Sequence, residues 1–223
     1  MARKDTFCLE HRVDTLANAL LQTVGENPIF FIDTGAAIDF ERTDVKECKL
    51  KDSKATIRQF YELLEARVRP IYVSEHVYNE MKFHCDCHKI NGLPEISKEH
   101  LERLNTYNRN YCEFLKTISG NGISLDESER HVREASVISL EKNPKKSVRD
   151  PISENDIGLM TTALWALHTT IPYGSVKGKQ RKISSSTIIS PDKHILLTVG
   201  VLSKDFYGRG LRAVHNREVQ NGR

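Results

Sequence analysis

Apolar residues along the chain form short runs that alternate with longer segments of helical spacing. The short runs predict strands at residues 29–33, 71–73, 187–190 and 211–214. Apolar positions three or four residues apart predict helices at residues 53–69, 74–81, 153–168 and 193–202. Strands that alternate with helices are typical of a parallel sheet with helical crossovers. We therefore expect an α/β fold with three layers, α/β/α, around a central parallel sheet.

Serine residues mark the predicted start of two of these helices. Ser74 follows the second apolar run and is a favourable N-cap for the segment SEHVYNEM. Ser153 precedes SENDIGLMTTALWALH, and Asp156 stands three residues later, which is the spacing of a capping box. These signals fix the predicted start of each helix more closely than the apolar spacing does.

Other segments extend this pattern. Residues 1–27 carry apolar side chains at helical spacing and predict a helical extension that precedes one domain at residues 28–223. Residues 96–140 contain two apolar stripes, one of which includes Leu115 and the other Val137 and Ile138, and predict a helical hairpin inserted into that domain. Residues 171–186 are rich in Gly, Ser and Lys and predict a mobile loop.

The composition is that of a globular protein, with 39% hydrophobic and 28% charged residues among 223. No apolar stretch is long enough to span a membrane, and residues 1–12 show no apolar signal segment. An odd number of cysteines, five, in a chain without an export signal predicts reduced thiols. We therefore expect a cytoplasmic protein with no membrane partner.

Acidic residues stand where the predicted strands end or the predicted helices begin. Asp33 ends the first apolar run, Glu80 lies in the helix after the second, Asp156 opens a later helix and Asp192 follows the third run. The carboxyl ends of parallel strands share one edge of a sheet, where open α/β folds gather their ligand sites. Clustered carboxylates repel one another unless a cation neutralises them, and oxygen ligands favour Mg²⁺ or Mn²⁺.

Each of these acids also has an ordinary explanation. An acid after a strand is often a turn residue, and an acid in the first turn of a helix often interacts with the helix dipole. Glu75 and Asp86 compete with Glu80 as the helix acid. Asp150 and Glu154 are candidates for an extended metal shell beside Asp156, although solvated surface is the simpler interpretation, and Asp205 falls too late in the chain to be the final acid. One architecture that brings the first four to the same edge favours a shared metal site over separate structural roles.

The segments FFIDTG, VYNEM, SENDIGLMTTAL and IISPDKHI resemble, in this order, the motif blocks of PIN-domain ribonucleases. The resemblance extends from about residue 29 to residue 214 and includes larger prokaryotic members with a helical insertion. It implies that the metal-binding and catalytic acids are Asp33, Glu80, Asp156 and Asp192. It also implies that Thr34 and Ser190 are the accompanying hydroxyls.

A PIN-like fold implies an endoribonuclease that hydrolyses RNA phosphodiester bonds with Mg²⁺ or Mn²⁺ and leaves a 5′-phosphate and a 3′-hydroxyl. Small toxin-type members are often dimeric, so a homodimer and an inhibitory protein partner are further expectations. The main alternative is a catalytically silent PIN-like module that binds RNA or a protein. The presence of all four acids favours the enzyme.

The net charge of +3 conceals a division along the chain. Residues 170–223 carry ten basic against three acidic residues, whereas residues 1–169 carry 23 against 27. A run of charges is usually solvated surface, but beside a carboxylate site it becomes a candidate for binding phosphates. The candidate RNA-binding residues are Lys145, Lys146, Lys177, Lys179, Arg181, Lys182, Arg209 and Arg212.

Two further features have weaker interpretations. Residues 84–88 (HCDCH) place His84, Cys85, Cys87 and His88 within five positions, and neighbours this close cannot all reach one zinc ion. We expect a polar helix end here rather than a zinc site. Tyr173 and Tyr207 lie near the basic segments and are candidates for stacking on bases.

Overall fold

The computed structural model describes residues 28–41, 71–91, 96–120, 122–142, 152–172 and 180–215. The helices predicted at residues 1–27 and 53–69 lie outside these ranges. The part of the chain that the structure describes contains seven strands and six helices.

Four parallel strands form the central sheet in the order β2-β1-β6-β7. They are β2 (Ile71–Tyr72), β1 (Pro28–Ile32), β6 (Ser185–Ile189) and β7 (Leu211–Val214). β1 and β6 pair over their full length, from Pro28 opposite Ser185 to Ile32 opposite Ile189. The predicted α/β fold with a parallel sheet is confirmed, and all four predicted strand segments belong to this sheet.

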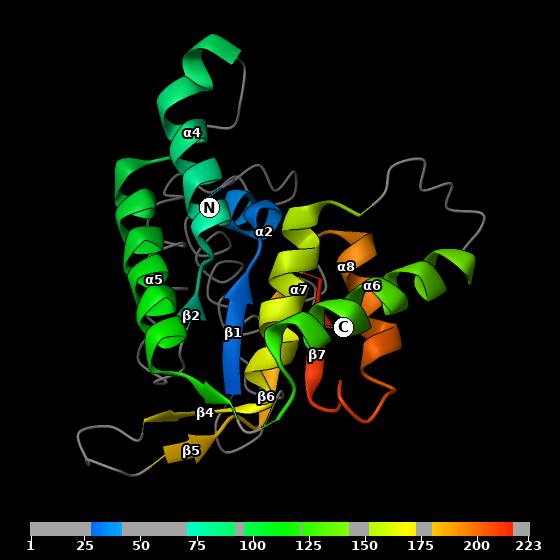
Figure 1. The fold of residues 1–223 in the computed structure, drawn as a ribbon. Helices are drawn as coiled ribbons and strands as arrows, with labels where there is room; N and C mark the ends of the chain where they lie inside the picture. The colour runs from blue at the N-terminus through cyan, green and yellow to red at the C-terminus, as the bar shows by residue number, and fades with distance from the viewer. Residues whose placement is uncertain are drawn as a thin grey trace, which may run out of the picture.

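Helices cover both faces of the sheet (Figure 1). α4 (Glu75–Asn91) and α5 (Lys98–Thr117) lie toward the β2 edge of the sheet. α6 (Leu125–Glu141), α7 (Glu154–Ala166) and α8 (Lys193–Leu202) lie toward the β7 edge. The short helix α2 (Thr34–Glu41) follows β1 directly. The helices predicted from residues 74, 153 and 193 are therefore confirmed.

Alternation along β1 divides the core into two parts. Ile29 and Phe31 belong to a cluster with residues of α6, α7 and α8, whereas Phe30 and Ile32 belong to a second cluster with residues of α2 and α4. Successive side chains of a strand point to opposite faces, so a strand buried on both faces is apolar throughout. This explains the unbroken run IFFI, whose four side chains are at most 1% exposed.

The segment 96–140 contains the two predicted helices, but they pack on different parts of the molecule. α5 packs against α4 and β2, while α6 packs against α7 and α8. The expected hairpin therefore does not form a layer of its own, and its status as an insertion stays a prediction. The second predicted stripe was wrong at Val137 and Ile138, which are 55% and 38% exposed, whereas Val132 and Ala135 are buried.

A small antiparallel sheet adjoins the lower end of the central one in Figure 1. It contains β3 (Ser119–Gly120), β4 (Thr169–Pro172) and β5 (Gln180–Lys182), in the order β3-β4-β5. The loop predicted at residues 171–186 is therefore wrong at both of its ends. Residues 171–172 belong to β4, residues 180–182 pair with β4, and residues 185–186 belong to β6. Residues 173–179 lie outside the described ranges.

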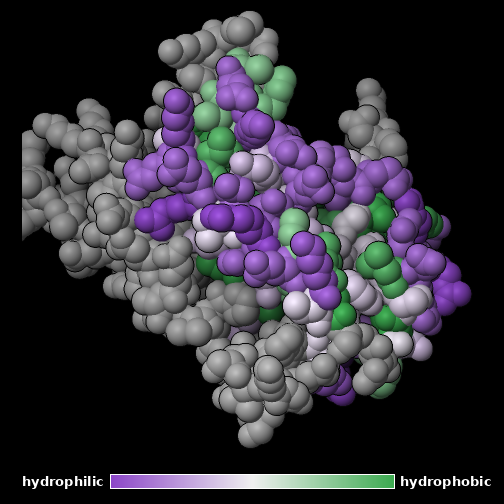
Figure 2. Space-filling view, turned by 60° about the vertical axis from the view of Figure 1, so that its left-hand side comes forward, coloured by the Kyte–Doolittle hydropathy of each residue, from purple (hydrophilic) through white to green (hydrophobic). Residues whose placement is uncertain are grey.

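Hydrophilic side chains dominate the described part of the face in Figure 2, with hydrophobic ones in smaller patches between them. Large exposed apolar residues occur on several elements, and the most exposed is Phe206 at 83%. Within the described ranges, no helix has the length and apolar character needed to cross a membrane.

Candidate functional site

Asp33 lies at the junction of β1 and α2. Its backbone N–H donates to the carbonyl of Ile189 (3.1 Å), which continues the ladder of the sheet, and its own carbonyl accepts from Ala37 N in the first turn of α2. The side chain also contacts the start of that helix, since Oδ1 accepts from Thr34 N at 2.7 Å. The end of the strand and the start of the helix thus fix the Asp33 carboxylate from both sides.

Ser190 joins the carboxylate of Asp33 to the segment that carries Asp192. Its buried hydroxyl donates to Asp33 Oδ2 (2.8 Å) and accepts from the backbone N–H of Asp192 (2.9 Å). Asp192 is the N-cap of α8, where Oδ1 accepts from His194 N at 2.6 Å. The second oxygen of Asp192 is left for other contacts.

Glu80 reaches the same region from the second turn of α4. Ser74 starts that helix, because its Oγ accepts from Val77 N at 3.3 Å. The hydroxyl of Thr34, which is 9% exposed, donates to Glu80 Oε2 at 2.8 Å. His76 Nε2 lies 3.3 Å from the same oxygen. Thr34 and His76 therefore both contact Oε2 of Glu80, and neither contacts Oε1.

Asp156 comes from the first turn of α7, where the predicted cap is confirmed. Ser153 Oγ accepts from Asp156 N at 3.1 Å and donates to Asp156 Oδ2 at 2.7 Å. The Ser153 side chain therefore fixes both the helix start and the orientation of the carboxylate.

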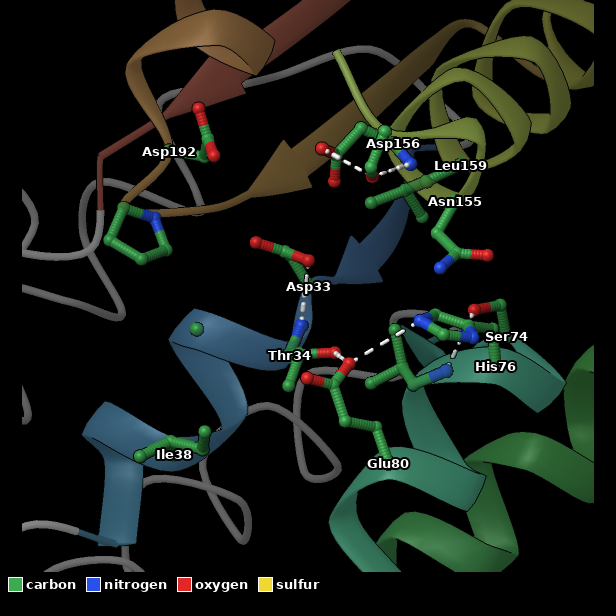
Figure 3. Close-up of a pocket in the computed structure, with 14 residues that line it drawn as sticks. Asp33, Thr34, Ile38, Ser74, His76, Glu80, Asn155, Asp156, Leu159 and Asp192 are labelled. Atoms are coloured by element: carbon green, nitrogen blue, oxygen red, sulfur yellow. Dashed lines mark hydrogen bonds and ion pairs between the residues drawn. The ribbon is translucent and has the colours of Figure 1, made fainter. Parts of the chain in front are cut away.

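All four predicted acids line one pocket of about 630 Å³ at the carboxyl ends of β1 and β6 (Figure 3). Asp33 lies between Asp192 and Asp156 on one side and Glu80 on the other. The pocket is lined by Asp33, Thr34, Gly35, Ile38, Ser74, His76, Val77, Glu80, Ser153, Asn155, Asp156, Leu159, Pro191 and Asp192. The structure thus brings together side chains from four separate segments of the sequence.

The carboxylates influence one another electrostatically. The pKa of Asp33 is raised from 3.8 to about 6, first by burial and then by the charges of Asp156 and Asp192, while the hydrogen bonds from Ser190 and Thr34 act in the opposite direction. The pKa of Asp156 is also raised, first by burial and then by the charge of Asp192. The carboxylates of this site repel one another when they are charged, and a bound cation relieves that repulsion.

The chemistry of these donors fits a hard divalent cation. Carboxylate and hydroxyl oxygens are the ligands that Mg²⁺ and Mn²⁺ prefer. The side chains do not, however, close around an ion as they stand, since no three His, Cys, Asp or Glu residues in the described ranges are grouped closely enough to hold a metal. Binding a cation here requires the carboxylates to move toward one another or ordered waters to complete the coordination.

Four of the predicted RNA-binding residues lie within the described ranges. Arg181 and Lys182 belong to β5, and Arg209 and Arg212 lie just before and within β7. None of these four lines the pocket, so the structure separates them from the acids. Lys145, Lys146, Lys177 and Lys179 lie outside the described ranges, as do Tyr173 and Asp150.

The other candidate acids within the described ranges do not line the pocket either. Glu75 and Asp86 are exposed on α4, and Asp205 is exposed after α8. Glu154 instead forms an ion pair with Arg133 of α6, which lowers the pKa of that carboxyl. Cys85 and Cys87 lie partly buried on α4, and neither lines the pocket.

Sequence reasoning missed the neutral residues of the pocket. His76 and Asn155 line it, and neither carries the carboxylate by which the other candidates were chosen. His76 stands four residues before Glu80, which places both on one face of α4, and Asn155 directly precedes Asp156. Proximity to the acids along each helix is the signal that identifies them.

The chain was also compared with known proteins. No protein-family model matches it, no curated protein matches it, and no solved structure matches it. Its function is therefore argued from the residues of the pocket.

Proposed function

We propose that this protein is a metal-dependent endoribonuclease that hydrolyses phosphodiester bonds in its acidic pocket. The observation that carries the proposal is that Asp33, Glu80, Asp156 and Asp192, from four segments, line one pocket at the carboxyl edge of the sheet. The raised pKa of Asp33 supports it, because a carboxyl group surrounded by other carboxylates is typical of a functional site.

The residues have separate roles in this proposal. Asp33, Asp156 and Asp192 would hold the Mg²⁺ or Mn²⁺, and Glu80 would contribute its free oxygen, Oε1, directly or through water. When bound, such a cation polarises the scissile phosphate and lowers the pKa of a water molecule. Ser190 and Thr34 keep the Asp33 and Glu80 carboxylates in place through hydrogen bonds of 2.8 Å each.

RNA is the proposed substrate for two reasons. The four motif blocks resemble those of PIN-domain ribonucleases, and residues 170–223 carry ten basic against three acidic residues. A basic segment attracts a polyanion through its phosphates without regard to sequence. A homodimer, an inhibitory protein partner and a cytoplasmic location stay predictions from the sequence.

The proposal is tested by incubating labelled RNAs with the protein in Mn²⁺ or in EDTA. We expect cleavage in Mn²⁺, none in EDTA, and at least a hundredfold slower cleavage by Asp33→Asn. Asp205→Asn is the matched control, since Asp205 is exposed and does not line the pocket. RNA binding with no cleavage of any RNA would instead support a catalytically silent module.

A further inference from the structure

The pocket has two walls of different chemistry. Asp33, Asp156 and Asp192 surround one part of it, while Ser74, His76 and Asn155 lie together at the other side (Figure 3). The second wall contributes hydroxyl, imidazole and amide groups beside the carboxylate of Glu80. In the proposed function the four carboxylates hold the cation, which leaves Ser74, His76 and Asn155 without a role.

The size of the pocket suits an organic ligand. Its volume of about 630 Å³ lies within the range of small-molecule sites, roughly 300–1,000 Å³. Most of the lining is polar, but Ile38, Val77 and Leu159 also contribute to it. These apolar side chains provide a surface against which an organic ring can pack.

Asn155 is placed to make new hydrogen bonds. It lies in the first turn of α7, between Glu154 and Asp156, and the Ser153 cap holds this turn in place. Its side chain is exposed, and the amide makes no hydrogen bond within the described part of the chain. An amide carries both a donor and an acceptor, so it can pair with two adjacent groups on the edge of a base.

His76 presents a planar ring on the same wall. Its side chain is 48% exposed, and Nε2 lies 3.3 Å from Glu80 Oε2, which holds one edge of the ring. The rest of the ring remains available for contact. Histidine is among the side chains on which unpaired bases stack in RNA complexes.

We infer that Asn155 and His76 form a nucleobase subsite that selects which residue of an RNA strand enters the pocket. The inference rests on the proposed function, because a phosphodiester held among the carboxylates keeps its attached nucleoside in the same pocket. The Asn155 amide would hydrogen-bond the edge of the base, and the His76 ring would lie against its face. Selectivity among bases then comes from Asn155, and affinity for any base comes from His76.

Binding by an inactive variant tests the subsite separately from cleavage. Fluorescence anisotropy of Asp33→Asn with labelled oligo(A), oligo(C) and oligo(U) of equal length measures three affinities. We expect the tightest and weakest to differ by about fivefold or more, as for loss of one bidentate contact to a base. Adding Asn155→Ala should reduce the difference to within about twofold, whereas Asn79→Ala, on the exposed side of α4, should leave it unchanged.

The stacking role has its own variants. In the same background, His76→Ala should weaken binding of all three oligonucleotides by at least about fivefold, as for loss of one base–aromatic stack. His76→Phe keeps a ring face and should retain most of the affinity. Circular dichroism melts show whether each variant is folded.

The outcomes separate this inference from the proposed function. Equal binding of the three oligonucleotides, no binding of any, or equal losses for His76→Ala and His76→Phe would overturn the subsite. Base selectivity that depends on Asn155, in a protein that cleaves no RNA in Mn²⁺, would support the subsite and contradict the hydrolase. Cleavage that is indifferent to base and to Asn155 would do the reverse.

Discussion

Asp33 is the residue of the pocket whose charged form is most clearly destabilised. Its carboxylate accepts hydrogen bonds from Thr34 N and Ser190 Oγ, and still its pKa is raised to about 6 by burial and by neighbouring carboxylates. Hydrogen bonds to the charged form lower a pKa, so burial outweighs both of them here. At neutral pH the fold therefore keeps a charge that destabilises it, as residues selected for function commonly do.

The free energy of unfolding should fall as this carboxyl group ionises. Because the pKa in the folded state is raised, its stabilising contribution is complete below pH 3.8 and is lost as the pH rises through about 6. The difference between 3.8 and about 6 corresponds to about 3 kcal/mol at most. Without divalent cations, urea unfolding should show Asp33→Asn more stable than the wild type at pH 8 and nearly equal to it at pH 4.

Two further measurements separate the causes of this difference. Saturating Mn²⁺ should raise the melting temperature of the wild type at pH 8 much more than that of Asp33→Asn, because a ligand of the native state stabilises it. Asp205→Asn, at an exposed carboxylate, should follow the wild type at every pH. An Asp33→Asn protein that is less stable than the wild type at pH 8 would show that the buried charge is not the dominant effect.

At the scale of the elements, strong local signals predicted the structure correctly. α8 (Lys193–Leu202) and β7 (Leu211–Val214) have the predicted bounds. α7 begins after the predicted cap at Ser153. In these segments the apolar spacing and the capping residues agree, so propensity and tertiary packing favour the same structure.

Segments whose pairing depends on distant parts of the chain were harder to predict. β5 has the polar sequence Gln-Arg-Lys and is a strand because it pairs with β4. β6 begins at Ser185, two residues before the predicted start, because it pairs with β1 over five residues. Because these strands contain polar residues, they lack the apolar pattern from which a strand is predicted. Their structure depends on pairing with the neighbouring strands.

The candidate site divides in the same way. The acids were predictable because strand ends and helix starts meet at one edge of a parallel sheet. His76 and Asn155 were not, because their position depends on how α4 and α7 face each other across the pocket. A sequence pattern gives the direction of a strand, but it does not give the distance between two helix ends.

The close approach of α2 to the segment after β6 requires a glycine. A Cβ atom on Gly35 would lie 2.5 Å from Cγ of Pro191, which precedes Asp192. We expect Gly35→Ala to lower the free energy of unfolding by about 1–2 kcal/mol, since overpacking exceeds the gain in helix propensity. RNA cleavage should also decrease, because moving Pro191 displaces Asp192.

Gly200→Ala is the matched control for this prediction. Gly200 is exposed in α8, and a Cβ there meets nothing within 4 Å. The substitution should raise the free energy of unfolding by about 0.5–1 kcal/mol and leave cleavage unchanged. Urea unfolding and initial rates of RNA cleavage measure both effects, and equal results for the two variants would contradict the steric argument.

At the scale of the whole molecule, the acids lie at one end of the sheet and Arg209 lies toward the other, with Arg212 within β7 between them. Ser190 N donates to the carbonyl of Val214 near the pocket, whereas Ser186 N donates to that of Gly210 near Arg209. Four residues of strand separate these two bonds, or roughly 13 Å. An RNA that contacts both ends must therefore extend well beyond the nucleotide in the pocket.

This separation predicts a dependence on RNA length. Arg209→Ala combined with Arg212→Ala should weaken binding of a long oligonucleotide and leave hydrolysis of a dinucleotide unchanged. For the long RNA, the slope of log affinity against log salt should become shallower by about 1.4, for two phosphate contacts. Arg130→Ala on α6 is the control. Equal effects on the two substrates would show that the arginines act on the pocket itself.

The hydrogen bond between Ser190 and Asp33 also determines when the acidic pocket can assemble during synthesis. It joins residues 157 positions apart, and β6 pairs with β1 in the middle of the sheet. Until β6 emerges from the ribosome, β1 has an unpaired edge and Asp33 lacks Ser190 and Asp192. A growing chain without β6 therefore contains no assembled acidic pocket, and under the proposed function the ribosome-bound RNAs around it are not exposed to a nuclease site before β6 is translated.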